Sequence, residues 1–186
     1  IITQGKKLGT YMYIYTGGEP LTRKNDLIRL CEKHNDCVFL CFTNATLIDE
    51  KFADEMLRVK NFIPAISLEG DEVSTDSRRG QGAYQKVVRA MKLLHEKKLP
   101  YGISSCYTSV NYEKITSDTY YNSLIDMGAY FIWYFHYMPV GNSAVPELLP
   151  TPQQREEMYK RIRHFRETKA IFGMDCQNDG QFVGGC

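Results

Sequence analysis

The chain has 186 residues, of which 43% are hydrophobic and 12% aromatic, and this is enough apolar material for one globular domain with a sizeable core. Its formal charge is +1, with 23 basic and 22 acidic residues spread along the chain, so no basic stripe indicates nucleic acid or an anionic membrane as a partner. The longest apolar run, residues 129–140, is too short to span a bilayer, and residues 1–10 lack the apolar segment of a signal peptide. We therefore expect a cytoplasmic protein with small-molecule or peptide partners.

Short apolar and β-rich runs recur along the chain, and each is followed by polar or turn residues. The first ends at Gly17-Gly18-Glu19-Pro20, where two glycines permit a sharp turn and the proline stops the strand. Such a segment alone is also typical of an ordinary strand-to-helix turn with a solvated glutamate. Strands are predicted over residues 11–15, 38–42, 62–68, 101–106, 130–137 and 171–174.

Helical patterns separate the predicted strands. Asp49 is a plausible N-cap, and residues 151–154 (Thr-Pro-Gln-Gln) have the form of a capping box with proline at the first helical position. The charged segment over residues 71–82 is expected to be a loop. Helices are predicted over about residues 23–34, after Asp49, around residues 84–94, over about residues 117–127 and from residue 151 onward.

This alternation predicts an α/β fold of parallel strands with helical crossovers, resembling part of a (βα) barrel. In such barrels the loops at the carboxyl ends of the strands build one site. The polar residues expected at that edge are Glu19, Asn44, Ser67, Ser105, His136 and Asp175. Polar loops are common in any such fold, but glycine and carboxylate occur together twice, at Gly17-Gly18-Glu19 and at Glu69-Gly70.

The six cysteines (Cys31, Cys37, Cys41, Cys106, Cys176 and Cys186) are irregularly spaced, which indicates free thiols and not a disulfide framework. Cys37 and Cys41 have half of an iron–sulfur spacing, but they lie within an apolar strand and share one face of it, as core thiols do. The chain starts at Ile1 and ends at Cys186 after two glycines, so we expect both ends to lie inside a longer protein.

Several motifs occur in order along nearly the whole chain, and no single one is specific. They are residues 15–21 (YTGGEPL), 43–48 (TNATLI), 66–70 (ISLEG), Arg78-Arg79-Gly80 with Gly82 and Tyr84, and 137–141 (YMPVG). Together they resemble the radical S-adenosylmethionine (radical SAM) superfamily, in particular enzymes with a C-terminal SPASM-like extension that carries auxiliary iron–sulfur clusters. The resemblance implies a single partial (βα)6 barrel domain over residues 1–186, starting at about barrel strand two and truncated at both ends.

The same resemblance implies roles for individual residues. A primary ammonium needs acceptors, which strand-end carbonyls and a carboxylate supply, and a guanidinium suits a carboxylate ligand. An exposed loop arginine is the alternative for Arg79. In similar enzymes the cofactor's amino group is held by the segment that matches Gly17, Gly18, Glu19 and Pro20, its carboxylate by the positions of Ser67 and Arg79, and its remaining parts lie near those of Asn44, Tyr137, Pro139 and Val140.

The cysteine-rich C-x3-C-x2-C loop of the superfamily, whose three thiolates hold a 4Fe–4S cluster, is absent from this sequence. The N-terminal strand and cluster loop, and the C-terminal extension, are thus expected outside the chain, with Cys186 as an auxiliary-cluster ligand in the longer protein only. The resemblance implies an enzyme that cleaves S-adenosylmethionine to a 5′-deoxyadenosyl radical and abstracts hydrogen from a peptide or protein substrate, with electrons from a reductant protein. The chain alone is expected to be inactive.

Two other hypotheses remain open. A barrel-like binding or scaffold protein that never held a cluster would share the fold and lack the chemistry. A hydrolase that uses Glu19 and Glu69 as a carboxylate pair is a third hypothesis, without other support in the sequence. The sequence predicts neither the substrate nor the oligomeric state.

Overall fold

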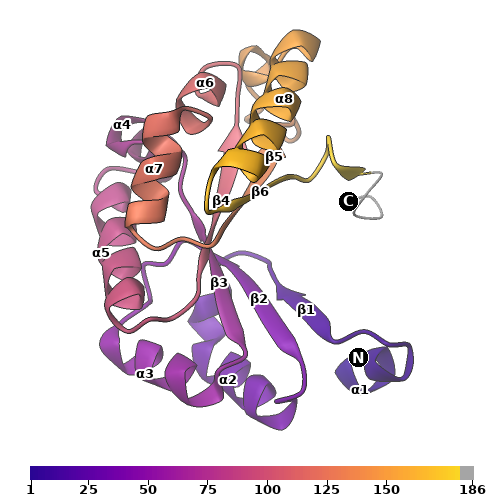
Figure 1. Cartoon of the computed structure of the whole chain (residues 1–186). Helices are drawn as coiled ribbons and strands as arrows, with labels where there is room; N and C mark the ends of the chain where they lie inside the picture. Colours follow the sequence, from indigo (N-terminus) through magenta and orange to yellow (C-terminus); the bar gives the residue numbers. More distant parts are fainter. Residues whose placement is uncertain (181–186) are drawn as a thin grey trace.

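A computed structural model of the chain describes residues 1–180, and within them six strands form one sheet in the order β1-β2-β3-β4-β5-β6. Every neighbouring pair is parallel. The sheet curls into a half-barrel with the helices outside it (Figure 1). The predicted α/β fold with a partial barrel of parallel strands is therefore confirmed. The strands are β1 (Met12–Tyr15), β2 (Val38–Thr43), β3 (Phe62–Ser67), β4 (Gly102–Tyr107), β5 (Phe131–His136) and β6 (Phe172–Asp175).

Four of the α-helices, α3, α4, α7 and α8, begin after a residue whose side chain caps them. The Asp49 carboxylate accepts a hydrogen bond from the Phe52 backbone N–H at 2.8 Å, and Thr151 and Gln154 form the predicted capping box. Two 3-10 helices, η1 and η2, complete the set. The helices are α1 (Ile2–Lys7), η1 (Pro20–Arg23), α2 (Lys24–Lys33), α3 (Glu50–Val59), α4 (Glu72–Arg79), α5 (Ala83–Glu96), α6 (Tyr112–Ile115), α7 (Asp118–Asp126), η2 (Pro146–Leu148) and α8 (Pro152–Thr168).

Helix α4 corrects the prediction of a loop over residues 71–82. The Asp71 side chain caps this helix by accepting from the Ser74 N–H at 3.0 Å. The Asp76 carboxylate then accepts from the N–H groups of Gly82 and Tyr84, at 2.7 and 2.8 Å, and joins α4 to α5. Only Thr75 of α4 is buried, so the helix has no apolar stripe from which it could have been predicted.

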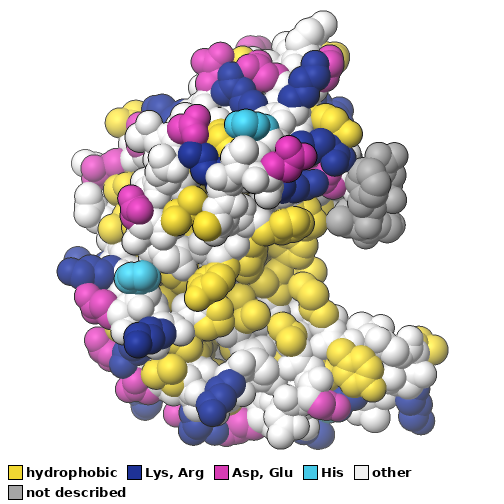
Figure 2. Space-filling view, viewed as in Figure 1, with side chains coloured by type: hydrophobic (Ala, Val, Ile, Leu, Met, Phe, Trp, Pro, Cys, Tyr) yellow, Lys and Arg dark blue, Asp and Glu magenta, His cyan; other side chains and the backbone are white. Residues whose placement is uncertain are grey.

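The two faces of the sheet differ in what covers them. Side chains such as Phe39, Ile66 and Ile132 point outward and pack with the helices in one hydrophobic core. The alternate positions face the hollow of the half-barrel, where hydrophobic side chains gather between the two halves of the molecule (Figure 2). The hollow is partly open, since Ile14 of β1 is 47% exposed and Phe172 of β6 is 58% exposed.

Four cysteines, Cys31, Cys37, Cys41 and Cys106, are free thiols, and the first three are buried. Free thiols are thus confirmed for these four, and burial on the strand is confirmed for Cys41 of β2. Within residues 1–180, no helix has the length and apolar character needed to cross a bilayer.

Strand β1 pairs with β2 on one side only, so its outer edge leaves backbone N–H and C=O groups free to pair with another chain. We predict that the chain self-associates through this edge, and that Ile14→Lys reduces the association because a charge on an edge strand opposes strand pairing. Light scattering across a concentration series measures this.

The matched control is Val73→Lys, which places the same charge on an exposed apolar residue of α4, away from the edge. This variant should associate as the unmodified chain does. An unmodified chain that stays monomeric at every concentration would contradict the prediction.

Candidate functional site

The polar residues that follow the strands come together along one edge of the sheet, because all six strands run in the same direction. Tyr15 pairs with Cys41, Ser67 with Ser104, and Tyr134 with Asp175. Carboxyl ends of neighbouring parallel strands therefore lie side by side, as the sequence predicts.

The turn after β1 leaves its backbone uncovered. Gly17 has φ +131°, a conformation that favours glycine, and a side chain at Gly17 or Gly18 would meet no atom within 4 Å. The two glycines thus keep space open beside the strand end, where a ligand could approach the main chain.

The Glu19 carboxylate ties the end of β1 to the end of β2. It accepts hydrogen bonds from the Thr43 hydroxyl at 2.6 Å, from the Asn44 backbone N–H at 2.8 Å and from the Leu21 N–H at 3.0 Å. A carboxylate with three donors already in place holds the loop in position and has little capacity left for a further donor. The open backbone at Gly17 and Gly18 is then the more accessible source of acceptors.

Glu69 plays the same part at the ends of β3 and β4. Its side chain is 1% exposed, accepts from the Cys106 backbone N–H at 2.8 Å and is paired with the guanidinium of Arg79, whose Nε donates at 3.0 Å and whose Nη2 also donates. Arg78 lies 3.4 Å from the same carboxylate oxygen. The pairing fixes the Arg79 guanidinium and leaves its Nη1 group without a hydrogen-bond partner in the described part of the chain, so it can still donate.

Three further predicted residues differ in how fully they are engaged. The Ser105 hydroxyl is buried and donates to the Leu68 carbonyl at 2.5 Å, so its role is structural. The Asn44 side-chain oxygen accepts from the Thr46 N–H and hydroxyl, which orders the loop after β2. Ser67 is half-buried, and no hydrogen bond to its hydroxyl occurs among residues 1–180.

The segment after β5 continues the edge. The Tyr137 N–H donates to the Tyr107 carbonyl at 2.8 Å, and the Tyr137 hydroxyl accepts from the Val145 N–H at 2.9 Å, which closes the loop between them. Pro139 is half-buried and Val140 is 80% exposed. The loop therefore presents apolar side chains and backbone groups beside the strand ends.

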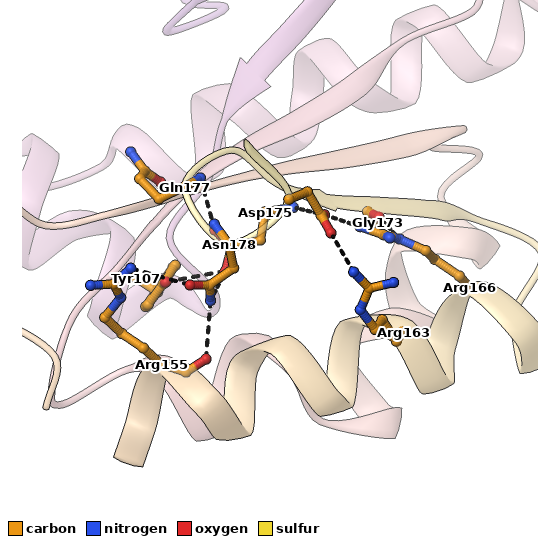
Figure 3. A network of polar contacts seen from close by, with 9 residues as sticks. Tyr107, Arg155, Arg163, Arg166, Gly173, Asp175, Gln177 and Asn178 are labelled. Carbon is orange, nitrogen blue, oxygen red and sulfur yellow. Dashed lines mark hydrogen bonds and ion pairs between the residues drawn. The ribbon is translucent and has the colours of Figure 1, made fainter. Parts of the chain in front are cut away.

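A polar network at the ends of β4 and β6 joins the predicted Asp175 to Tyr107, Asn178 and Arg155 of α8, which no sequence motif indicated (Figure 3). The buried Asp175 carboxylate accepts from the Tyr107 hydroxyl at 3.1 Å and from the Asn178 side chain at 2.8 Å, while Arg155 donates to Asn178 at 3.2 Å. Burial raises the pKa of Asp175, against hydrogen bonds that lower it. No local pattern could have predicted Arg155, because it lies 23 residues from its partner.

Asp179 extends this network to the body of α8. It forms ion pairs with Arg163, at 3.3 Å, and with Arg166, and its carboxylate accepts from the Asp175 backbone N–H at 3.0 Å. The network thereby fixes the path of the chain as it leaves β6.

His136 lies beside this network, with its ring centroid 6.1 Å from that of Tyr107. Burial, and then the charge of Arg155, lower the pKa of His136, so its imidazole is neutral at neutral pH. Its Nδ1 atom is buried without a hydrogen-bond partner in the described residues. This neutral ring is not poised to release a proton.

Within residues 1–180, no group of three or more His, Cys, Asp or Glu side chains could hold a metal ion. Burial raises the pKa of Cys31 and Cys41 to about 12, so these thiols stay protonated, and a metal ligand must be a thiolate. The described residues thus do not fit an iron–sulfur cluster. Cys186, the predicted auxiliary-cluster ligand, lies outside them.

The chain is similar to two proteins of known source. It is 25% identical over 169 residues to the AdoMet-dependent heme synthase of Methanosarcina barkeri. The aligned region covers 88% of this chain and 46% of that protein. It is 30% identical over 105 residues to an uncharacterized protein of Methanocaldococcus jannaschii, which covers 52% of this chain and 37% of that protein. The chain spans less than half the length of either relative.

Crystal structures of SuiB from Streptococcus suis have the same fold. SuiB bound to S-adenosylmethionine matches with a TM-score of 0.78 at 18% identity, over 94% of this chain and 41% of SuiB. SuiB bound to its precursor peptide SuiA matches with a TM-score of 0.74 at 17% identity, over 98% of this chain and 42% of SuiB. At these identities the likeness shows the fold alone.

The family model of the radical SAM superfamily matches residues 1–121 of the 186. The matched part contains the turn after β1, the end of β2, the buried Glu69 pair and the strand β4, so it covers most of the edge described above. By this match, the chain belongs to the radical SAM superfamily.

Proposed function

We propose that this chain forms the S-adenosylmethionine-binding part of a radical SAM enzyme. The observation that carries the proposal is the arrangement of the Gly17-Gly18-Glu19 turn, Ser67 and Arg79 along one strand edge, each with acceptor or donor groups still open. When it is reductively cleaved at a 4Fe–4S cluster, S-adenosylmethionine supplies a 5′-deoxyadenosyl radical that abstracts hydrogen from a substrate.

The turn after β1 would bind the cofactor's ammonium group. Its glycines leave the main chain accessible, and backbone carbonyls with a nearby negative charge stabilise a cation. Glu19 contributes that charge, while its three hydrogen bonds keep the turn in place. Pro20, at the start of η1, fixes the direction in which the chain leaves the turn.

Ser67 and Arg79 would bind the cofactor's carboxylate. The Ser67 hydroxyl has no hydrogen-bond partner within residues 1–180, and the Nη1 group of Arg79 remains able to donate. Glu69 holds the guanidinium from the other side and offsets its charge, so that binding a second carboxylate does not require Arg79 to move. Asn44 would lie beside the same part of the cofactor.

The loop after β5 would contact the adenine. Tyr137, Pro139 and Val140 offer an apolar surface and backbone groups, and the hydrogen bond from Val145 to the Tyr137 hydroxyl orders the loop before a ligand binds. An adenine needs this combination, because it is flat and apolar with hydrogen-bonding edges.

The whole enzyme requires residues beyond these. The cluster's ligands are not among the described residues, so a longer protein would supply the N-terminal strand with the cluster loop, the C-terminal extension and the docking surface for a reductant protein. Residues 1–186 would form one partial barrel domain of it. A peptide or protein substrate is our first candidate, because SuiB, which shares the fold, was crystallised with a precursor peptide.

Two alternatives are weaker. In the carboxylate-pair hydrolase, Glu19 and Glu69 would have to act as acid and base, but both are already engaged by several donors. A scaffold protein without a cluster would not need the open groups at Ser67 and Arg79, although it would share the fold.

The first prediction concerns affinity. Binding of S-adenosylmethionine to the chain alone should be weak, on the order of millimolar, because a few charge-assisted hydrogen bonds must offset the lost freedom of the ligand without an iron to chelate it. Calorimetry should show that Arg79→Ala weakens this binding. Micromolar binding, or an unchanged affinity in the variant, would show that the site is assigned wrongly.

The second prediction concerns Glu69. The variant Glu69→Gln should weaken cofactor binding and lower the free energy of unfolding by about 1–3 kcal/mol, because it removes the buried charge that holds Arg79 in place. Urea denaturation and calorimetry measure the two effects. The control is Glu72→Gln, an exposed residue of α4 that contacts Gln85, for which a change within about 0.5 kcal/mol is expected. Equal effects of the two variants would argue against a positioning role for Glu69.

The third prediction tests the chemistry. The chain alone, supplied anaerobically with iron and sulfide, should release no 5′-deoxyadenosine under dithionite, whereas a longer protein with the cluster loop should release it. Release from the chain alone would overturn our interpretation of its cysteines. A cluster-loaded longer protein that cleaves no S-adenosylmethionine would favour the scaffold hypothesis.

A further inference from the structure

The concave side of the half-barrel carries no charged side chain on any strand from β1 to β6. These strands contain one carboxylate, Asp175, and one imidazole, His136. Both lie at the network at the ends of β4 to β6, where Asp175 is buried against Tyr107. The surface that lies below the cofactor edge is therefore uncharged. A charged group that entered it would lose its hydration without gaining a partner.

Three aromatic rings from opposite sides of the hollow meet within it. The ring of Phe42 lies 5.3 Å from that of Trp133 and 5.6 Å from that of Phe135, as centroid distances. Strands β2 and β5 are not neighbours in the sheet, so these contacts cross the hollow. We name the three rings the aromatic floor.

The floor lies between an apolar pocket and the carboxyl ends of the strands, where the cofactor is proposed to bind (the cofactor edge). Phe42 directly precedes Thr43, which binds Glu19, and Phe135 pairs with Cys106, which binds Glu69. Toward the amino ends of the strands, the concave side contains a pocket of about 330 Å³. Its lining is entirely apolar and includes Val38, Leu40 and Phe131.

Unpaired polar groups lie at the level of the floor. Ser67, Ser104 and Trp133 lie at matching register positions on the neighbouring strands β3, β4 and β5. Neither serine hydroxyl has a hydrogen-bond partner among the described residues. The Trp133 indole N–H is buried and also lacks one. The indole N–H is shielded by its surroundings, whereas the two serine hydroxyls remain accessible and could donate to a ligand with an acceptor.

These features together are unlike a closed barrel core. A closed core would not expose Ile14 and Val38, which are 47% and 41% accessible. Aromatic rings beside a few unpaired donors are instead typical of a small binding site for an apolar group that carries one acceptor.

We propose that the aromatic floor of Phe42, Trp133 and Phe135 binds an uncharged aromatic side chain of a peptide substrate, and that the Ser104 hydroxyl donates a hydrogen bond to a backbone carbonyl of the same peptide. This proposal rests on the proposed function, because it places the substrate next to the cofactor edge. It assigns specificity to the floor, which admits an aromatic side chain and excludes a charged one.

Trp133 is the only tryptophan of the chain and therefore reports on the floor directly. The probes are three capped tripeptides, acetyl-Gly-Xaa-Gly-amide with Xaa as Phe, Ala or Asp. Titration of the chain with the Phe peptide should change the tryptophan fluorescence along a saturable curve, with an affinity at least about tenfold above that of the Asp and Ala peptides. Equal affinities for the three peptides, or no saturable change with the Phe peptide, would overturn the proposal.

Two variants locate the binding. Phe135→Leu should weaken binding of the Phe peptide at least about fivefold, since it removes a ring contact of the floor. The matched control, Tyr130→Leu, removes an aromatic side chain that is 66% exposed outside the hollow, and it should leave the affinity unchanged. If Phe135→Leu does not fold, as judged by circular dichroism, Phe42→Leu takes its place. Equal losses in the floor and control variants would overturn the proposal.

Calorimetry with S-adenosylmethionine on the same preparation separates this proposal from the proposed function. Cofactor binding together with an absent or non-selective peptide response would refute the floor alone. Selective peptide binding without cofactor binding would refute the proposed function, and with it the assignment of the peptide as a substrate.

Discussion

Two buried or half-buried carboxylates hold the edge formed by the carboxyl ends of the strands in place. Glu19 follows β1 and accepts a hydrogen bond from the backbone N–H of Asn44 at the end of β2. Glu69 follows β3 and accepts one from the backbone N–H of Cys106 at the end of β4. Each thus joins the end of its own strand to that of the next. Because charge-assisted hydrogen bonds are stronger than neutral ones, these two contacts fix the spacing of four strand ends. The openness of Gly17, Ser67 and Arg79 to a ligand depends on this spacing.

The order of the strands and of most of the longer helices could be predicted from the sequence, because these elements carry an apolar period and α3 and α8 also carry a cap. The recurrence of a carboxylate beside glycine, at Glu19 and at Glu69, was also visible. Its cause was not, since the partners of Glu69 lie 10 and 37 residues away and only the folded sheet brings them together. Helix α4 was not predicted although its capping contacts are local, because its surface lacks the apolar stripe by which a helix is recognised.

The division between edge and hollow bears on the kind of chemistry that the fold can support. At the edge, Glu69 is paired with Arg79, Glu19 accepts three hydrogen bonds from neutral donors, and both glutamates hold loops in place. Within the hollow, the strands present serine, cysteine and aromatic side chains, and burial keeps the Cys106 thiol neutral by raising its pKa. Reactions that need a general acid and base require groups near the substrate that exchange protons near neutral pH, and the described strands turn no carboxylate, imidazole or ammonium group toward the hollow. Abstraction of a hydrogen atom moves no net charge, and a surface without charges therefore suits it.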